Sequence, residues 1–119
     1  SVISTNQDIQ LLLSSGAGSD SDRLQRITHA RDLVDNIISL LTFFTALDRV
    51  DLDRAEELLT EVKRIEFSCF GLKSILSQSM DSVNLFREQQ KQIRKFSQII
   101  NEAANRVVTI SLVAKVPLE

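Results

Sequence analysis

His29 is the only histidine in the chain, and it gives the sequence its one candidate for phosphoryl chemistry. Arg26 and Asp32 precede and follow it at a distance of one helical turn. An exposed imidazole beside a carboxylate can accept a phosphoryl group, which makes His29 the candidate phosphoacceptor. The alternative is an ordinary histidine at the edge of a packed helix face, because short motifs often arise by chance. A lone histidine also excludes metal sites built on paired histidines.

Cys69 is the only cysteine, so the chain cannot form an internal disulfide. This usage is typical of a reducing compartment and predicts a cytoplasmic protein. The residue falls on an apolar helical stripe, which predicts a buried structural thiol. A nucleophilic thiol would need a basic neighbour, and His29 is distant in sequence. We therefore predict no enzyme activity and no catalytic residue apart from the candidate His29.

Two groups of charged residues remain, and neither has the spacing of a metal or nucleic-acid site. The acidic group comprises Asp51, Asp53, Glu56, Glu57 and Glu61. These carboxylates would be dispersed around a helix. There they would interact favourably with the positive end of the helix dipole and face solvent. The basic group comprises Arg87, Lys91, Arg94 and Lys95, and no aromatic residue interleaves it for base stacking. It is predicted to be a solvated face, the alternative being a contact with an acidic partner.

The composition limits the class of protein further. The net charge is only −2, which argues against a nucleic-acid partner. No apolar run approaches the length of a membrane span, so we expect no membrane insertion. With 119 residues and 43% hydrophobic content, the chain can form one globular domain. We predict a single domain over residues 1–119, without metal or cofactor.

The Gly/Ser-rich segment 14–21 divides this domain into a short N-terminal part and a helical core over 22–116. Before it, Asn6 can cap a short helix from Gln7 to Leu13. A second helix should begin after Asp20 or Ser21 and extend to about residue 48. A third should begin at residue 52, after the capping residue Asp51.

The segment 77–84 is rich in Ser, Asp and Asn, which favour turns and caps over helix interiors. We interpret it as a turn, although one continuous helix over 52–115 is the alternative. The last helix should then run from Val83 to Val116 and end at Pro117. Three long helices joined by short turns, with the short N-terminal helix as a fourth element, predict an all-α antiparallel bundle.

Apolar residues at alternating steps of three and four mark the packed face of each long helix. In the last helix they are Ile93, Phe96, Ile100, Ala103, Val107, Ile110 and Ala114. In the second helix they are Leu24, Ile27, Ala30, Val34, Ile37, Leu41 and Phe44, with a second row of Leu33, Leu40, Phe43 and Leu47. In the third helix they are Leu52, Ala55, Leu59, Val62, Ile65, Cys69, Leu72 and Leu76. Gly71 lies within the third helix and predicts close packing there.

Two segments resemble helices of bacterial signalling proteins. The stretch 92–116, QIRKFSQIINEAANRVVTISLVAKV, is similar to the helix that enters the signalling tip of methyl-accepting chemoreceptors. The positions in register are Ile100, Glu102, Ala104, Leu112, Ala114 and Val116. Val108, Val113 and Pro117 depart from the family pattern, so the resemblance implies a coiled signalling helix without the kinase-contacting tip. The Ile-Ile-Ser-x-Leu tail of residues 29–41 resembles one subgroup of histidine-kinase dimerisation helices, without that subgroup's Lys-Asn-Asn stretch.

These observations predict a protein that works by helix–helix association. The first hypothesis is a signalling or scaffold module that binds a protein partner or a second copy of itself as a homodimer. The second is a phosphotransfer and dimerisation bundle that uses His29. The third is a fragment of a helical-rod assembly such as a vesicle-tethering subunit.

Overall fold

The computed structural model describes residues 2–14, 20–42, 52–80 and 83–113. Within these ranges the regular elements are α1 (Val2–Ser14), α2 (Asp20–Thr42), α3 (Leu52–Ser79), α4 (Val83–Glu88) and α5 (Gln90–Val113). The predicted all-α fold is therefore confirmed for the described part of the chain. The molecule is elongated, with extents of 50 × 20 × 18 Å.

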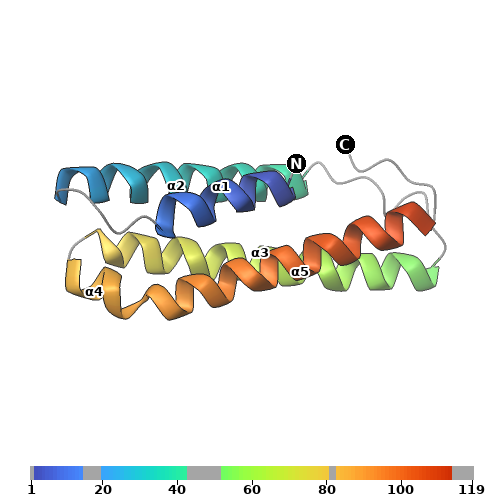
Figure 1. The fold of residues 1–119 in the computed structure, drawn as a ribbon. Coiled ribbons are helices and arrows are strands. Elements are labelled where there is room, and N and C mark those ends of the chain that lie inside the picture. Colours follow the sequence, from blue (N-terminus) through green and yellow to red (C-terminus); the bar gives the residue numbers. More distant parts are fainter. Residues whose placement is uncertain (1, 15–19, 43–51, 81–82, 114–119) are drawn as a thin grey trace.

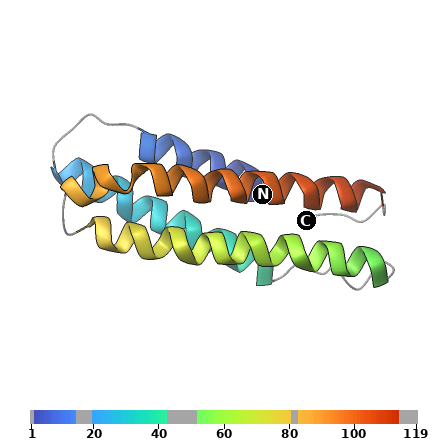
Figure 2. The same cartoon turned by 90° about the horizontal axis from the view of Figure 1, so that it is seen from below.

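The helices form two pairs that lie against each other (Figure 1). α1 lies beside α2, and α3 lies beside α5, while α2 contacts α3 and α1 contacts α5. Seen from below, α3 and α5 extend beyond the end of α2 (Figure 2). Two contacts join α3 to α5: Glu61 with Arg106, and Gly71 with Phe96. The continuous-helix alternative is wrong, because α3 ends at Ser79 and α5 packs back on it within one chain.

The N-terminal helix is longer than predicted, which makes four long helices rather than three. α1 has 13 residues and begins at Val2 instead of Gln7. Asn6 does not cap it but lies inside it, fully buried. The sequence pattern suggested a cap because a polar residue precedes an apolar run. Asn6 instead forms hydrogen bonds with a buried partner on α5, described below.

The predicted last helix is divided into two. α4 ends at Glu88 and α5 begins at Gln90, with Gln89 between them. The backbone N–H of Gln89 donates to the carbonyl of Leu85, and that of Ile93 donates to the carbonyl of Gln89, each at 2.9 Å. The hydrogen-bond ladder therefore continues through the junction. The predicted ends of the second and last helices, and the predicted capping residue Asp51, lie outside the described residues.

The apolar seam of α5 forms one wall of the core. Ile100 and Ala103 are completely buried, Ile93, Val107 and Ile110 nearly so, and Phe96 is partly buried. Ser97 and Ala104 are also buried there, so the face is wider than a strict seam. The α2 stripe is likewise buried at Ile27, Ala30, Val34 and Ile37.

Two predicted core positions are wrong. Leu59 of α3 is 41% exposed, whereas its neighbour Leu58 is fully buried. Leu40, from the second row on α2, is 44% exposed. Neighbouring residues on a helix point about 100° apart, so the orientation that buries Leu58 completely directs Leu59 partly towards solvent. None of the helices in the described ranges combines the length and apolarity needed to cross a lipid bilayer.

Candidate functional site

His29 lies on the exposed side of α2. Its neighbours Ala30 and Ile27 are buried, so the imidazole lies beside the packed face of the helix rather than on it, as the sequence predicted. Asp32, one turn on, is also exposed. Accessibility is the first requirement of a phosphoacceptor, but the transfer itself stays a prediction.

Cys69 is fully buried on α3, in the position predicted for a structural thiol. Burial, together with the negative charge of nearby Glu66, raises the pKa of this thiol from 9.0 to about 12. The thiolate is the reactive form of cysteine. Within the described residues, no group of three His, Cys, Asp or Glu side chains is arranged to hold a metal ion.

We expect Cys69 to resist thiol reagents in the folded protein at about pH 8 and to react once denaturant unfolds the chain. The folded state retains a proton that the unfolded state loses at high pH. The thiol's contribution to stability is therefore complete below pH 9 and is lost as the pH rises towards about 12. The matched control places a cysteine at exposed Asn105 of α5 in a Cys69→Ser background, where labelling should be fast. Equally fast labelling of native Cys69 would contradict this assignment.

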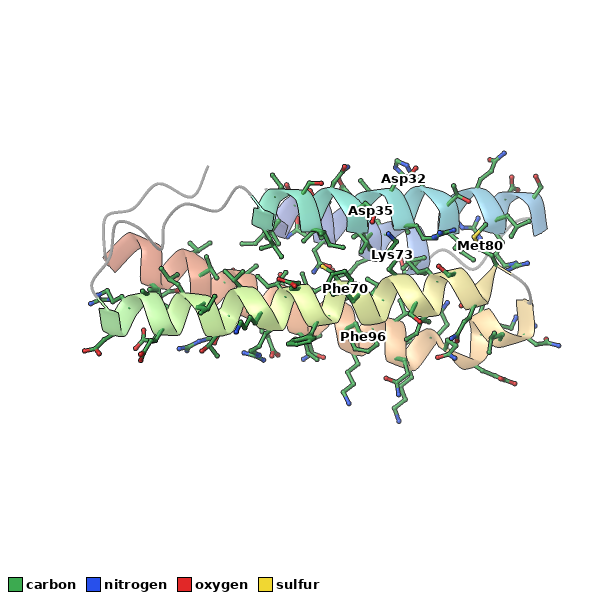
Figure 3. All side chains as sticks on the ribbon, turned by 180° about the vertical axis from the view of Figure 1, so that it is seen from behind. Asp32, Asp35, Phe70, Lys73, Met80 and Phe96 are labelled. Atoms are coloured by element: carbon green, nitrogen blue, oxygen red, sulfur yellow. The ribbon has the colours of Figure 1, made fainter. Side chains whose placement is uncertain are left out.

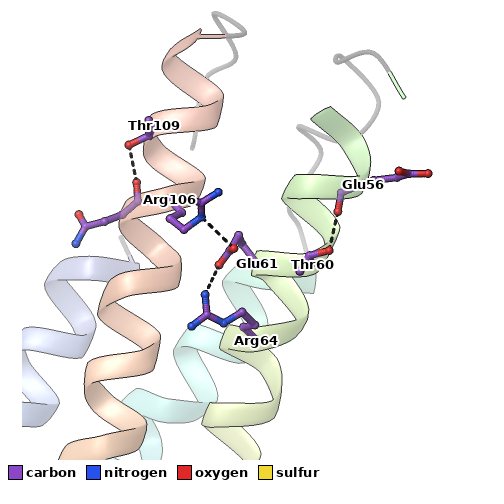
Figure 4. A network of polar contacts seen from close by, with 7 residues as sticks. Glu56, Thr60, Glu61, Arg64, Arg106 and Thr109 are labelled. Atoms are coloured by element: carbon purple, nitrogen blue, oxygen red, sulfur yellow. Dashed lines mark hydrogen bonds and ion pairs between the residues drawn. The ribbon is translucent and has the colours of Figure 1, made fainter. Parts of the chain in front are cut away.

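The acidic group is solvated as predicted at Asp53, Glu56 and Glu57, but not at Glu61. Glu61 is 7% exposed and bridges two helices (Figure 4). Its Oε1 accepts a hydrogen bond from Arg106 Nε of α5 at 3.1 Å, and its Oε2 accepts one from Arg64 Nη1 at 3.0 Å. Both arginines are partly exposed, so the cluster joins α3 to α5 near the surface. Asp51 lies outside the described residues.

A second polar contact, missed by the sequence analysis, lies deep between α1 and α5. Asn6 Nδ2 donates to the carbonyl oxygen of Ser97 at 3.0 Å, and Ser97 Oγ donates to Asn6 Oδ1 at 3.1 Å. Both residues are almost completely buried. A buried, reciprocally bonded amide fixes the register of two packed helices, because a shift would leave polar atoms without partners.

The basic group is exposed throughout, with Arg87 on α4 and Lys91, Arg94 and Lys95 on α5. This agrees with the predicted solvated face. Beside Arg94, a groove of about 930 Å³ lies between α1 and α5. Its described lining combines the apolar side chains of Leu11, Leu13 and Ile93 with Gln, Ser and Arg side chains. Asp, Glu, His and Cys are missing from that described lining, so the groove offers amide groups rather than acid–base pairs.

Three of the five large hydrophobic side chains that are exposed among the described residues lie on the outer face of α3. We define the α3 outer face as Leu59, Lys63, Glu66, Phe67 and Phe70. Phe67 is 73% exposed and Phe70 is 51% exposed, one helical turn apart. Figure 3, seen from behind, labels Phe70 on α3 and Phe96 on α5. Phe96 packs against Gly71 of the same chain.

The opposite side of α3 packs against the bundle, which leaves the α3 outer face accessible to solvent. Leu58, Ile65, Cys69, Leu72 and Leu76 are buried towards the bundle. On the α2 side, Lys73 Nζ donates to Asp35 Oδ1 at 2.7 Å, and the two side chains point towards each other in Figure 3. The packing of α2 and α5 therefore occupies the inner half of the helix. The sequence contained the signal for the outer face, since Phe67 and Phe70 fall off the apolar stripe, but aromatic residues are more often core.

A search against family models, curated proteins and solved structures found no match to the chain. The resemblance of residues 92–116 to a chemoreceptor helix therefore stays a prediction. The function must be argued from the exposed surfaces of the protein.

Proposed function

We propose that this protein is a helical interaction module, acting in a signalling or scaffold assembly, that binds a protein partner through the α3 outer face. The observation that carries the proposal is the exposure of Phe67 and Phe70 on one side of a helix whose other side is packed. Aromatic side chains are the residues that most often dominate binding energy at protein interfaces. Contiguous exposed apolar residues of this kind are also uncommon on a surface that binds nothing.

The energetic argument concerns what the two phenylalanines contribute in the free protein. Burying one phenylalanine side chain stabilises a protein by about 1.5–3 kcal/mol. Phe67 and Phe70 gain only part of this in the isolated chain, since each is at least half exposed. A partner that covers both recovers the remainder, and Leu59 adds to the same apolar area.

The bundle arrangement supports the same proposal. We propose an antiparallel four-helix bundle of α1, α2, α3 and α5, which agrees with the opposite order of the α3 and α5 contacts. In such a bundle each long helix has an inward and an outward side. A rigid, packed helix can present its outward residues to a partner without a further ordering cost.

The test uses a photoreactive benzoylphenylalanine at position 67 of the full chain, in cells that express it. We expect adducts with a defined partner, and we expect the Phe70→Ser substitution in the same chain to abolish them. The matched control places the same residue at exposed Lys95 on α5, which should give no such adduct. Equal adducts at both positions, or adducts insensitive to Phe70→Ser, would refute the proposed interface.

A further inference from the structure

The α3 outer face has a pattern that its exposure alone does not explain. Leu59, Lys63, Glu66 and Phe70 follow one another at steps of four, three and four residues, the spacing of a coiled-coil seam. All four side chains are exposed. In the described part of the chain, Lys63 and Glu66 make no ion pair with another residue. This is a second seam on α3, directed away from the bundle.

The chemistry of this seam is symmetric about its midpoint. Its two ends are apolar, Leu59 and Phe70, and its two inner positions carry opposite charges, Lys63 and Glu66. A two-fold axis between positions 64 and 65 exchanges the ends with each other and the inner positions with each other. A surface with this property is complementary to a copy of itself, as an interface with two-fold symmetry requires.

We propose that the partner of the α3 outer face is a second copy of this chain, bound antiparallel along α3. The inference rests on the proposed function, because it uses the same surface. In this arrangement Leu59 packs against Phe70 of the other copy, and Lys63 pairs with Glu66 of the other copy. Each contact occurs twice because of the two-fold symmetry. The seam therefore has two ion pairs at its centre and one Leu59–Phe70 contact at each end. Phe67 flanks these contacts and covers their edge.

Charge decides the direction of the pair. A parallel arrangement would place Lys63 against Lys63 and Glu66 against Glu66 of the other copy, and like charges across a helix seam repel. The antiparallel arrangement replaces both repulsions with attractions. An unrelated partner would need its own opposite pattern of charges, whereas a second copy supplies that pattern without further assumption.

The first experiment is sedimentation equilibrium of the full chain over a concentration range up to about 100 μM. We expect a dimer whose dissociation constant increases at least tenfold with Lys63→Glu, because two pairs of like charges then face each other. The double substitution Lys63→Glu with Glu66→Lys should restore the wild-type constant to within about threefold. The control Lys95→Glu makes the same charge change away from the seam and should leave the constant unchanged. Circular dichroism checks that every variant remains folded.

The second experiment measures the orientation with one spin label per chain. The exposed positions Thr60 and Gln78 suit the labels. At a rise of 1.5 Å per residue, an antiparallel pair centred between 64 and 65 offsets two labels at 60 by about 14 Å and two labels at 78 by about 40 Å along the helix. A parallel pair would give short distances at both positions and would overturn the proposal.

The outcomes separate this inference from the proposed function. A chain that stays monomeric at about 100 μM, while position 67 still forms adducts with a different protein, overturns self-association alone. A monomer without adducts at position 67 overturns both. A dimer that Lys63→Glu does not weaken, or that the double substitution does not restore, shows that the α3 seam is not the interface.

Discussion

Ile100→Asp should unfold the protein. Ile100 is completely buried at the centre of the α5 seam. Loss of a large apolar side chain costs about 2–5 kcal/mol, and a buried, unpaired carboxylate adds several kcal/mol more. Proteins of this size are usually stable by about 5–15 kcal/mol. We therefore expect loss of the helical circular dichroism signal and of the cooperative thermal transition.

The matched control is Asn105→Asp, which places the same carboxylate at an exposed position of α5. We expect its melting temperature to remain within a few degrees of the wild type, since surface substitutions usually change stability by less than about 0.5 kcal/mol. Val107→Asp, at another buried position of the seam, should resemble Ile100→Asp. Unchanged melting in both seam variants would mean that α5 does not form a wall of the core.

Gly71→Leu should be the second most damaging substitution, because α5 leaves no space for a side chain there. A Cβ atom at Gly71 would lie 2.7 Å from Cζ and 2.9 Å from Cε1 of Phe96. These distances are shorter than van der Waals contact, so the ring or the helix must move. Overpacking of this kind costs about 1–3 kcal/mol. Urea denaturation should show a lower free energy of unfolding for this variant.

A double-mutant cycle with Phe96→Ala tests whether the ring is the cause. Removing the ring should create space for the leucine introduced at position 71, so the double variant should be more stable than the sum of the single effects predicts. Gly71→Ala is the intermediate case: its helix propensity gains about 1 kcal/mol over glycine, against a smaller displacement of the ring. Strictly additive effects of Gly71→Leu and Phe96→Ala would contradict the close contact of α3 with α5.

The helices were predictable from the sequence because their signal is local. The spacing of Ile93, Ile100 and Val107 is enough to orient α5, and the structure buries all three. Gly71 was predictable for a similar reason, since a glycine that weakens a helix usually serves close packing. The choice between Leu58 and Leu59 was not predictable in this way, because both are leucines and only the neighbouring helices decide which one is buried.

The polar contacts could not be predicted because their partners are far apart in sequence. Glu61 and Arg106 are separated by 45 residues, and a local interpretation assigns both to solvent. Asn6 fits a helix cap on local grounds, and only the position of Ser97 on α5 shows its actual role. The α3 outer face was partly visible, since the positions of Phe67 and Phe70 lie off the apolar stripe. Their exposure became clear only once α2 and α5 were placed on the other side.

The hydrogen bonds between Asn6 and Ser97 also have a consequence for the order of folding. These residues are 91 positions apart, whereas the Glu61–Arg106 contact of α3 with α5 spans 45. Closing a longer loop costs more chain entropy, by about 0.6 kcal/mol for each doubling of its length. The α1–α2 and α3–α5 contacts, which span shorter stretches of chain, can therefore form early, and the docking of α1 on α5 joins the two pairs at the end. Because a register shift would leave the buried amide without partners, this final step either joins α1 to α5 in the correct register or leaves the two pairs apart, and a slipped intermediate gains little stability.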